Sequence, residues 1–504
     1  MGKLNELQQK RLNLEQGGGK DSIEKQHQSG KKTARERLSM LFDDDTFVEV
    51  GAFVNHRCVE FDMNDNKFPA DGVVTGHGAI DGRLVYAFAQ DFTVVGGAVG
   101  EMNSKKICNI FDLALKTGAP VIGIYDSNGA RVEEGVDVLK GFGETFKKMS
   151  DVSGVVPHIS VISGPCAGGA SFAPALSDFV FAVKGSASLF VNSPSIIKGS
   201  GNDDITSESL GGAEALANKS GIASIVCENE DECFQEVREL LSYLPSNALN
   251  VPMLSECSDA TGRILNLSEG NYENGISNIK SVISDVVDDN KFFETRAEYA
   301  KNIVTGFARM NGLSVGIVAN QSSQNDGLLD SKASEKAARF VRFCDCFSIP
   351  VITFTDVAGY VASKDEEQNG LSLNASKLVY AFSEMTAPKV NVIVGKAYGS
   401  AYIAMNSKHL GADICLAWPN ADISIINSVA ASELMFGNDT TKKRAEKLQD
   451  YKERFANPYV AASRGYVDDI INPSETRLRI IAALEMLFEK SEAIPPKKHG
   501  NMPL

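Results

Sequence analysis

Two stretches of this 504-residue chain, GVVTGHGAIDGRLVYAFAQ (72–90) and NIVTGFARMNGLSVGIVAN (302–320), align without a gap and decide the fold. Both contain Val-Thr-Gly, which ends at Gly76 in the first stretch and at Gly306 in the second, an offset of 230 residues. Solenoid repeats have much shorter periods, about 20–50 residues. We therefore interpret the offset as the duplication of a whole domain.

The match continues along the chain. The segment DSNG (126–129) corresponds to DVAG (356–359) at the same offset, and Gly168 corresponds to Gly399 at an offset of 231. A drift of one residue over this distance is small. Duplication therefore extends over most of the chain.

An earlier match fixes the division between the copies. LFDDDTFVEV (41–50) corresponds to VVDDNKFFET (286–295) at the larger offset of 245, so the first copy carries a longer loop. The boundary falls between about 255 and 285, where the sequence is polar and rich in Gly, Asn and Ser. We expect an N-terminal domain at 1–260 and a C-terminal domain at 261–504.

Each copy has the pattern of an α/β domain. Short apolar runs such as LVYAFAQ (84–90) and PVIGIYD (120–126) alternate with helical patterns such as EMNSKKICNIFDLALKTG (101–118). Buried parallel strands connected by crossover helices have this pattern. The turns at the ends of these strands are where we expect the chemistry.

Composition disfavours several classes of protein. The formal net charge is −15, so the chain repels nucleic acid globally. The nine cysteines are scattered, and the closest pair, Cys344 and Cys346, is not spaced as a metal motif. The start is polar, and no apolar run reaches the length of about 18 residues typical of a membrane span. We expect a cytoplasmic protein that binds no metal and no nucleic acid.

Two glycine-rich turns are the candidate reaction centres. GPCAGGASF (164–172) and GKAYGSAYI (395–403) each run from an apolar strand through small residues into a helix. The first N–H groups of a helix lack partners, and small residues let a ligand oxygen approach them. Two such groups make an oxyanion hole. Tight packing of a helix on a sheet also selects small residues and stays an alternative.

Five motifs then carry a family resemblance: DSNGARVEEG (126–135), GPCAGGA (164–170), TDVAG (355–359), KAYGSAY (396–402) and AWP (417–419). Together they resemble the carboxyltransferase subunits of biotin-dependent acyl-CoA carboxylases and decarboxylases, the family of propionyl-CoA carboxylase β and methylmalonyl-CoA decarboxylase α subunits. The resemblance covers nearly the whole chain.

The resemblance implies two spiral domains of the crotonase (ClpP-like) type, the first binding an acyl-CoA and the second biotin, in a homohexamer built from dimers. The implied reaction transfers a carboxyl group between carboxybiotin and the acyl-CoA α-carbon, or runs in reverse in a sodium-pumping decarboxylase. The chain has no Met-Lys-Met attachment motif, so biotin is expected on a separate carrier protein. A biotin carboxylase or membrane decarboxylase subunits would be the further partners.

The resemblance assigns the thioester enolate to Gly168 and Gly169, and the biotin ureido oxygen to Gly399, Ser400 and Ala401. Residues expected to bind the acyl-CoA are Gly129, Ala130, Arg131, Ala167, Ile403, Lys31 and Arg35. Residues expected to bind biotin are Val357, Ala358, Gly359, Tyr360 and Asn427.

The C-terminal copy departs from the family pattern in three places. Leu373-Asn374-Ala375 replaces the usual Arg-His-Gly, and residues 426–428 stand where relatives carry a Met-Gly-Ala run. Ile403 occupies a position that is often Asp in propionyl-type relatives. A non-catalytic paralogue that keeps the scaffold is therefore the competing interpretation.

Other interpretations of single residues remain open. Ser171, with His158 and Asp178, could form a hydrolase triad, although a structural role for His158 is favoured. Cys166 could be a reactive thiolate or a small buried residue. Arg131 could anchor CoA or pair with Glu133 or Glu134.

The basic run KKTARER (31–37) also has two interpretations. Its cations could bind the 3′-phosphate of CoA, since phosphate recognition uses Lys and Arg. A solvated helix face is the alternative.

Overall fold

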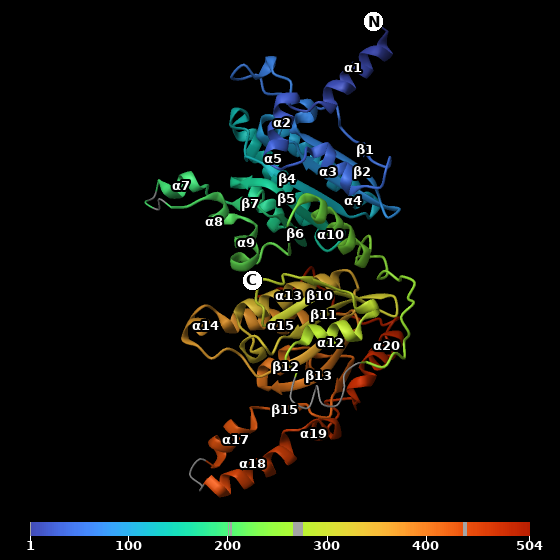
Figure 1. The fold of residues 1–504 in the computed structure, drawn as a ribbon, viewed down its shortest axis with the longest axis vertical. Coiled ribbons are helices and arrows are strands. Elements are labelled where there is room, and N and C mark those ends of the chain that lie inside the picture. The colour runs from blue at the N-terminus through green and yellow to red at the C-terminus, as the bar shows by residue number, and fades with distance from the viewer. Residues whose placement is uncertain (1, 200, 202–203, 266–275, 437–440, 504) are drawn as a thin grey trace. The chain divides into compact units, whose positions relative to one another are not determined.

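The protein divides into two compact units, Met1–Asn250 and Val251–Leu504 (Figure 1). The computed structural model describes residues 2–199, 201, 204–265, 276–436 and 441–503. The division comes before the polar segment because that segment already pairs with the second unit. Ser255 N–H donates to the Gly312 carbonyl at 2.9 Å.

The first unit is built on an eight-stranded sheet of order β1-β2-β3-β4-β5-β6-β8, with β7 paired to β5. Strands β3 to β6 and β8 run parallel, as the βαβ pattern predicts. Its strands are β1 (Val48–Glu49), β2 (Val73–Ile80), β3 (Arg83–Gln90), β4 (Val121–Ser127), β5 (His158–Ala167), β6 (Phe179–Val183), β7 (Ser188–Phe190) and β8 (Ile225–Cys227). Its helices are α1 (Lys3–Glu15), α2 (Lys20–Gln28), α3 (Ala34–Leu41), α4 (Glu101–Thr117), α5 (Val136–Val152), α6 (Phe172–Ala175), α7 (Pro194–Lys198), α8 (Ser207–Gly211), α9 (Ala213–Ala215) and α10 (Glu230–Tyr243).

The second unit repeats this sheet as β9-β10-β11-β12-β13-β14-β16, with β15 paired to β13. Its strands are β9 (Phe292–Thr295), β10 (Ile303–Met310), β11 (Leu313–Asn320), β12 (Val351–Val357), β13 (Lys389–Tyr398), β14 (Ile414–Ala417), β15 (Asp422–Ser424) and β16 (Asp469–Ile470). Its helices are α12 (Ile279–Val286), α13 (Ser331–Cys346), α14 (Lys364–Gln368), α15 (Leu371–Glu384), α16 (Gly399–Ala404), α17 (Ser428–Phe436), α18 (Thr441–Phe455), α19 (Pro458–Ser463) and α20 (Thr476–Met486).

Strand register confirms the duplication. Gly76 pairs with Ala87 in the β2–β3 hairpin, and Gly306 pairs with Ile317 in the β10–β11 hairpin, each 230 residues further on. A one-residue slip would turn every side chain to the other face of the sheet, so the two hairpins bury the same faces. The predicted α/β class and tandem repeat are therefore confirmed.

Each unit has its own apolar core. In the first unit, the buried rings of Phe88 and Phe111 pack edge to face, with centroids 6.0 Å apart. In the second, Trp418 is fully buried, and its indole N–H donates to Thr476 Oγ1 at 3.0 Å. Fully burying a large apolar side chain stabilises a fold by about 1.5–3 kcal/mol.

Equivalent carboxylates begin equivalent helices. Glu134 accepts the N–H of Glu101 at 2.6 Å at the start of α4, and Glu366 accepts the N–H of Ser331 at 2.9 Å at the start of α13. An acidic group at a helix N-terminus satisfies a free donor and interacts favourably with the helix dipole. Both glutamates come from the segment that follows the next strand, Glu134 from a helical turn and Glu366 from α14, so each cap fixes that segment.

Two buried lysines hold equivalent helices to the sheet. Lys106 of α4 donates to the carbonyls of Ala70 and Val73, and Lys336 of α13 donates to those of Tyr299 and Ile303 at 2.8 and 2.7 Å. Burial lowers the pKa of Lys106 to about 8 and that of Lys336 to about 7. These contacts tie each helix to the backbone at the start of the neighbouring strand.

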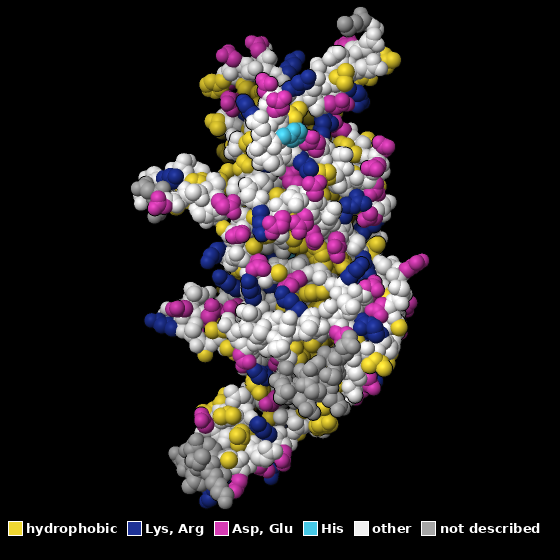
Figure 2. Space-filling model, in the orientation of Figure 1, with side chains coloured by type: hydrophobic (Ala, Val, Ile, Leu, Met, Phe, Trp, Pro, Cys, Tyr) yellow, Lys and Arg dark blue, Asp and Glu magenta, His cyan; other side chains and the backbone are white. Residues whose placement is uncertain are grey.

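Charged side chains of both signs share the visible surface of each unit (Figure 2). Among the helices that the structure describes, none has the length and apolarity needed to cross a bilayer. Over the same residues, no group of three or more His, Cys, Asp and Glu side chains is arranged to hold a metal ion.

Candidate active site

The first glycine-rich turn follows β5 directly. Ala167 ends the strand, and Gly168 takes a left-handed conformation with φ +64°, which L side chains adopt only at a cost. The turn closes when the Ser171 hydroxyl donates to the Gly168 carbonyl at 2.7 Å. A Cβ at Gly168 would meet nothing within 4 Å, so the space in front of this residue is open.

The second turn repeats this geometry after β13. Gly399 follows Tyr398 with φ +59° and begins α16, and Ser400 is exposed beside it. A Cβ at Gly399 would lie 2.9 Å from the Ile425 carbonyl, so only glycine fits without displacing that loop. Ala401 is buried one residue further on.

Both turns present backbone donors. None of the backbone hydrogen bonds of the described turns and loops is donated by Gly168, Gly169, Gly399 or Ser400. These residues form the first turn of a helix, whose N–H groups have no intrahelical acceptor. Each turn can therefore direct N–H groups at one oxygen, which is the geometry that stabilises an oxyanion.

The loop after β4 comes to the first turn. Val99 and Ala130 form a bridge, and Gly129, with φ +105°, approaches the end of β5 so closely that a Cβ would lie 3.0 Å from the Ala167 carbonyl. Gly129, Ala130 and Ala167 therefore lie together with Gly168. The family resemblance assigned these residues to one site, and the fold places them side by side.

The loop after β12 has the same place in the second unit. Leu329 and Tyr360 form the equivalent bridge, and Gly359 has φ +139°. Val357 is buried and pairs with Ala397 near the end of β13, while residues 358–360 are half-buried. Burial raises the pKa of Tyr360 to about 12, so its hydroxyl stays protonated near neutral pH.

Asn427 and Ile403 lie on exposed segments of the second unit. The Asn427 side chain accepts the Ala430 N–H at 2.8 Å and caps the start of α17. Ile403 is 39% exposed on α16, one turn after Ser400. The departures at 373–375 lie in the first turn of α15, which contacts α16.

Arg131 is fully buried in an ion network. Its guanidinium contacts Asp71 at 2.6 Å and Glu134 at 2.7 Å, so of its two candidate acidic neighbours Glu134 is the partner. Burial raises the pKa of Asp71, and the neighbouring Arg131 offsets only part of this rise. The network joins the loop after β4 to the turn before β2. A direct contact between Arg131 and CoA stays a prediction.

The basic run is built into the first unit. Lys31 contacts Asp126 at 2.9 Å, and Arg35 contacts Glu49 at 2.8 Å. The structure does not bring Lys31 and Arg35 together at one anion site, since each has its own carboxylate. Their binding of the CoA phosphate stays a prediction.

Arg37 belongs to the same basic run, but the sequence did not indicate its structural role. It is fully buried and contacts both Asp126 at 2.9 Å and Glu230 at 2.7 Å. These partners are 89 and 193 residues away along the chain. No local pattern could have indicated them.

The hydrolase triad is not formed. The Ser171 hydroxyl is used by Gly168, and the Asp178 carboxylate accepts the His158 backbone N–H at 2.8 Å. Neither ring nitrogen of His158 has a partner among the described residues, and burial lowers the pKa of this side chain to about 3. Burial likewise raises the thiol pKa of Cys166, which is therefore not a thiolate.

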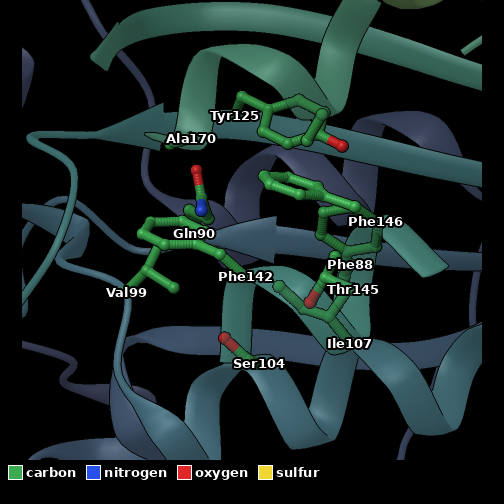
Figure 3. Close-up of a pocket in the computed structure, with 11 residues that line it drawn as sticks. Phe88, Gln90, Val99, Ser104, Ile107, Tyr125, Phe142, Thr145, Phe146 and Ala170 are labelled. Carbon is green, nitrogen blue, oxygen red and sulfur yellow. The ribbon is translucent and has the colours of Figure 1, made fainter. Parts of the chain in front are cut away.

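A pocket lies beside the first turn (Figure 3). Ala170 of the turn forms part of its wall, and a Cβ at Gly169 would lie 3.2 Å from the ring of Phe142, which also lines it. The remaining wall is mostly aromatic and aliphatic. No local pattern in the sequence indicates this pocket, because its residues come from β3, β4, α4, α5, α6, the glycine-rich turn and the loop before α4.

Comparison with known proteins bears on these sites. The carboxyl transferase domain family matches residues 25–502. The chain is 47% identical to the carboxyltransferase subunit of propionyl-CoA carboxylase from Haloferax mediterranei, covering 100% of this chain and 99% of that protein. It is 48% identical to the methylmalonyl-CoA decarboxylase α subunit from Veillonella parvula, with the same coverage of each chain.

A solved structure agrees over the whole length. The crystal structure of transcarboxylase 12S, described as a hexamer with hydrolysed methylmalonyl-coenzyme A bound, superposes with a TM-score of 0.96 at 44% identity. The match covers 100% of this chain and 99% of that one.

Proposed function

We propose that this protein transfers a carboxyl group between biotin and the α-carbon of propionyl- or methylmalonyl-CoA. The chain belongs to the carboxyl transferase family, whose members are subunits of biotin-dependent acyl-CoA carboxylases and decarboxylases. The same residues serve either direction, since both pass through the same thioester enolate.

The observation that carries this proposal is the repeated turn. Gly168 and Gly399 have nearly the same left-handed φ at the start of a helix, each at the end of the same strand of its unit. Carboxyl transfer develops negative charge on two oxygens, one on the thioester and one on the ureido ring. A chain with two sets of N–H donors can stabilise both without a side-chain nucleophile.

In the first unit, the N–H groups of Gly168 and Gly169 hold the thioester oxygen as the enolate forms. The open space in front of Gly168 leaves room for that oxygen, which supports the fit. Gly129 and Ala130 lie beside the turn and orient the thioester.

In the second unit, Gly399, Ser400 and Ala401 hold the ureido oxygen, and the exposed Ser400 leaves the turn accessible. Val357 to Tyr360 and Asn427 form the surrounding wall. Biotin, when bound there, supplies the base and carries the carboxyl group. The neutral Tyr360 hydroxyl adds no charge that would repel a carboxylate.

The partners follow from this chemistry. Biotin reaches the second turn on a separate carrier protein, and either a biotin carboxylase or a membrane decarboxylase subunit completes the enzyme. The hexamer named for transcarboxylase 12S supports a homohexamer here.

Transfer of labelled carboxyl from methylmalonyl-CoA to free biotin or a biotinylated carrier tests the proposal. We expect Gly168→Ala and Gly399→Ala each to lower the transfer rate about 10²–10³-fold, the usual effect of damaging an oxyanion hole. The methyl group at position 168 would enter the open space where the oxygen binds, and the one at position 399 would press on the Ile425 carbonyl and displace the turn.

Gly185→Ala and Gly465→Ala are the matched controls. Both glycines have positive φ, +72° and +74°, and open space for a Cβ, but lie outside the turns. They share the backbone strain and should keep the rate. If the wild-type protein binds CoA thioesters but neither forms nor consumes carboxybiotin, the chain is a non-catalytic paralogue.

A further inference from the structure

The pocket beside the first turn is small and lined in large part by aromatic rings. Figure 3 shows the rings of Phe142 and Phe146, from α5, between Ala170 and Ile107. Phe88 and Tyr125, from β3 and β4, also line the pocket. All of these residues belong to the first unit.

The pocket continues from the proposed thioester site. Ala170 follows Gly169 directly, and the Phe142 ring faces the Gly169 Cα. A thioester whose oxygen lies at the N–H groups of Gly168 and Gly169 therefore has this pocket as a neighbour. Its acyl chain beyond the α-carbon is the group close enough to enter.

Size limits what can enter. The cavity volume is about 20 Å³. A cavity needs about 10–15 Å³ to hold one water molecule, so this one holds a single group of about the size of a methyl. A longer chain would have to displace Phe142 or Phe146.

Charge limits the occupant as well. Among the residues that line the pocket, none is Lys, Arg, His, Asp or Glu. Burial raises the pKa of Tyr125, so this hydroxyl stays neutral. Burying an unpaired carboxylate is very costly, which excludes acyl groups with a terminal carboxylate, such as succinyl, from the pocket.

We propose that this pocket receives the terminal methyl group of a three-carbon acyl chain, so that Phe142 and Phe146 set propionyl-CoA as the longest good substrate. This inference rests on the proposed function and names its substrate. Acetyl-CoA lacks the methyl group and leaves the pocket empty. Butyryl-CoA exceeds it by one methylene.

The test compares acetyl-, propionyl-, butyryl- and succinyl-CoA as carboxyl acceptors. Wild-type protein should prefer propionyl- over butyryl-CoA by about 10–200-fold in kcat/KM, the range that one methylene gives in an apolar pocket. Phe142→Ala and Phe146→Ala should each raise the butyryl to propionyl ratio at least about tenfold. Both rings are only partly buried, so these variants should fold.

Phe292→Ala is the matched control, because Phe292 is also partly buried but packs against the core of the second unit. It should leave the ratio unchanged. An unchanged ratio in both pocket variants, or equal use of propionyl and butyryl groups by the wild type, would overturn the inference.

Dissociation constants of the same four thioesters, measured by calorimetry, separate the two proposals. If no carboxyl transfer occurs with any of them, the proposed function fails, and the ratio of binding constants still decides the pocket. A butyryl to propionyl binding ratio that rises in Phe142→Ala supports the inference. A ratio that does not change contradicts it.

Discussion

The two strand-end aspartates, Asp126 and Asp356, stand at equivalent points of the two units and are held by different groups. Asp126 is fully buried and contacts the cations of Lys31 and Arg37, both at 2.9 Å. Asp356 accepts the Lys396 N–H at 2.8 Å and the hydroxyl of Ser322. The first carboxylate is neutralised by two cations of the N-terminal segment, and the second is held by uncharged donors, a backbone N–H and a hydroxyl.

What both sites share is a glycine on the next strand. A Cβ at Gly164 would lie 1.9 Å from an Asp126 carboxylate oxygen, and one at Gly395 would lie 2.5 Å from an Asp356 oxygen. The backbone requirement is therefore the same in both units, while the counter-charges differ. The two units therefore share the backbone geometry at these strand ends, and they differ in the groups that compensate the charge of the aspartate.

Removing Arg37 should have the largest effect. Arg37→Ala leaves Asp126 and Glu230 buried with less counter-charge, and breaking a buried pair costs about 3–5 kcal/mol. Ser322→Ala removes one hydrogen bond from Asp356, which keeps the Lys396 N–H, and should cost about 1 kcal/mol. Denaturant unfolding measures both free energies.

Arg11→Ala, on the exposed helix α1, controls for the loss of a charge alone and should change stability little. Equal losses in Arg37→Ala and Ser322→Ala would show that the two aspartates are held equally strongly. The contrast between the units would then be wrong.

A second comparison concerns two equivalent arginine–aspartate ion pairs, of which the more deeply buried one now lies in the second unit. Arg477 contacts Asp288 at 2.6 Å with its side chain fully buried, and Arg238 contacts Asp43 at 2.8 Å with 27% of its side chain exposed. Arg477→Ala should cost about 3–5 kcal/mol, because it leaves a buried carboxylate unpaired. Arg238→Ala should cost about 1 kcal/mol or less, because water screens the exposed pair.

Thermal or denaturant unfolding of both variants compares them directly. Asp43 and Asp288 each also accept two backbone N–H groups of the facing hairpin, so the two carboxylates have similar backbone partners and differ in burial. A larger loss for Arg238→Ala would contradict the expectation.

The two buried lysines, one in each unit, should make the stability of the protein depend on pH. Because burial lowers the pKa of Lys336 to about 7 and of Lys106 to about 8, the unfolded chain binds more protons above those values. Stability should therefore rise with pH from each folded value toward the unfolded value of about 10.4, by at most about 1.4 kcal/mol per pH unit for each lysine.

Unfolding free energies between pH 6 and 9.5 test this. Lys336→Met should lose the part of the rise that begins near pH 7, and Lys106→Met the part that begins near pH 8. Lys105→Met removes an exposed neighbour and should keep the wild-type slope. Identical slopes in all three variants would refute the shifted pKa values.

The fold could be predicted from the sequence because its signals are local or repeated. The Val-Thr-Gly matches at Gly76 and Gly306 required only that two stretches be aligned, and their strand registers agree. The turn glycines could be predicted for a similar reason. Gly168 and Gly399 mark positions where the backbone conformation itself limits the side chain.

The ion networks and the pocket were decided only by tertiary structure. Arg37 meets Glu230 across 193 residues, and Phe142 faces Gly169 from another helix. A buried cation needs a carboxylate within a few ångströms, wherever in the chain that carboxylate comes from. The sequence by itself determined the repeated backbone and its two glycine turns, because the conformation of a residue's own backbone limits which side chain it can carry. Only the tertiary structure decided which charged groups pair with the buried aspartates and which residues line the pocket, because both depend on which distant segments come together.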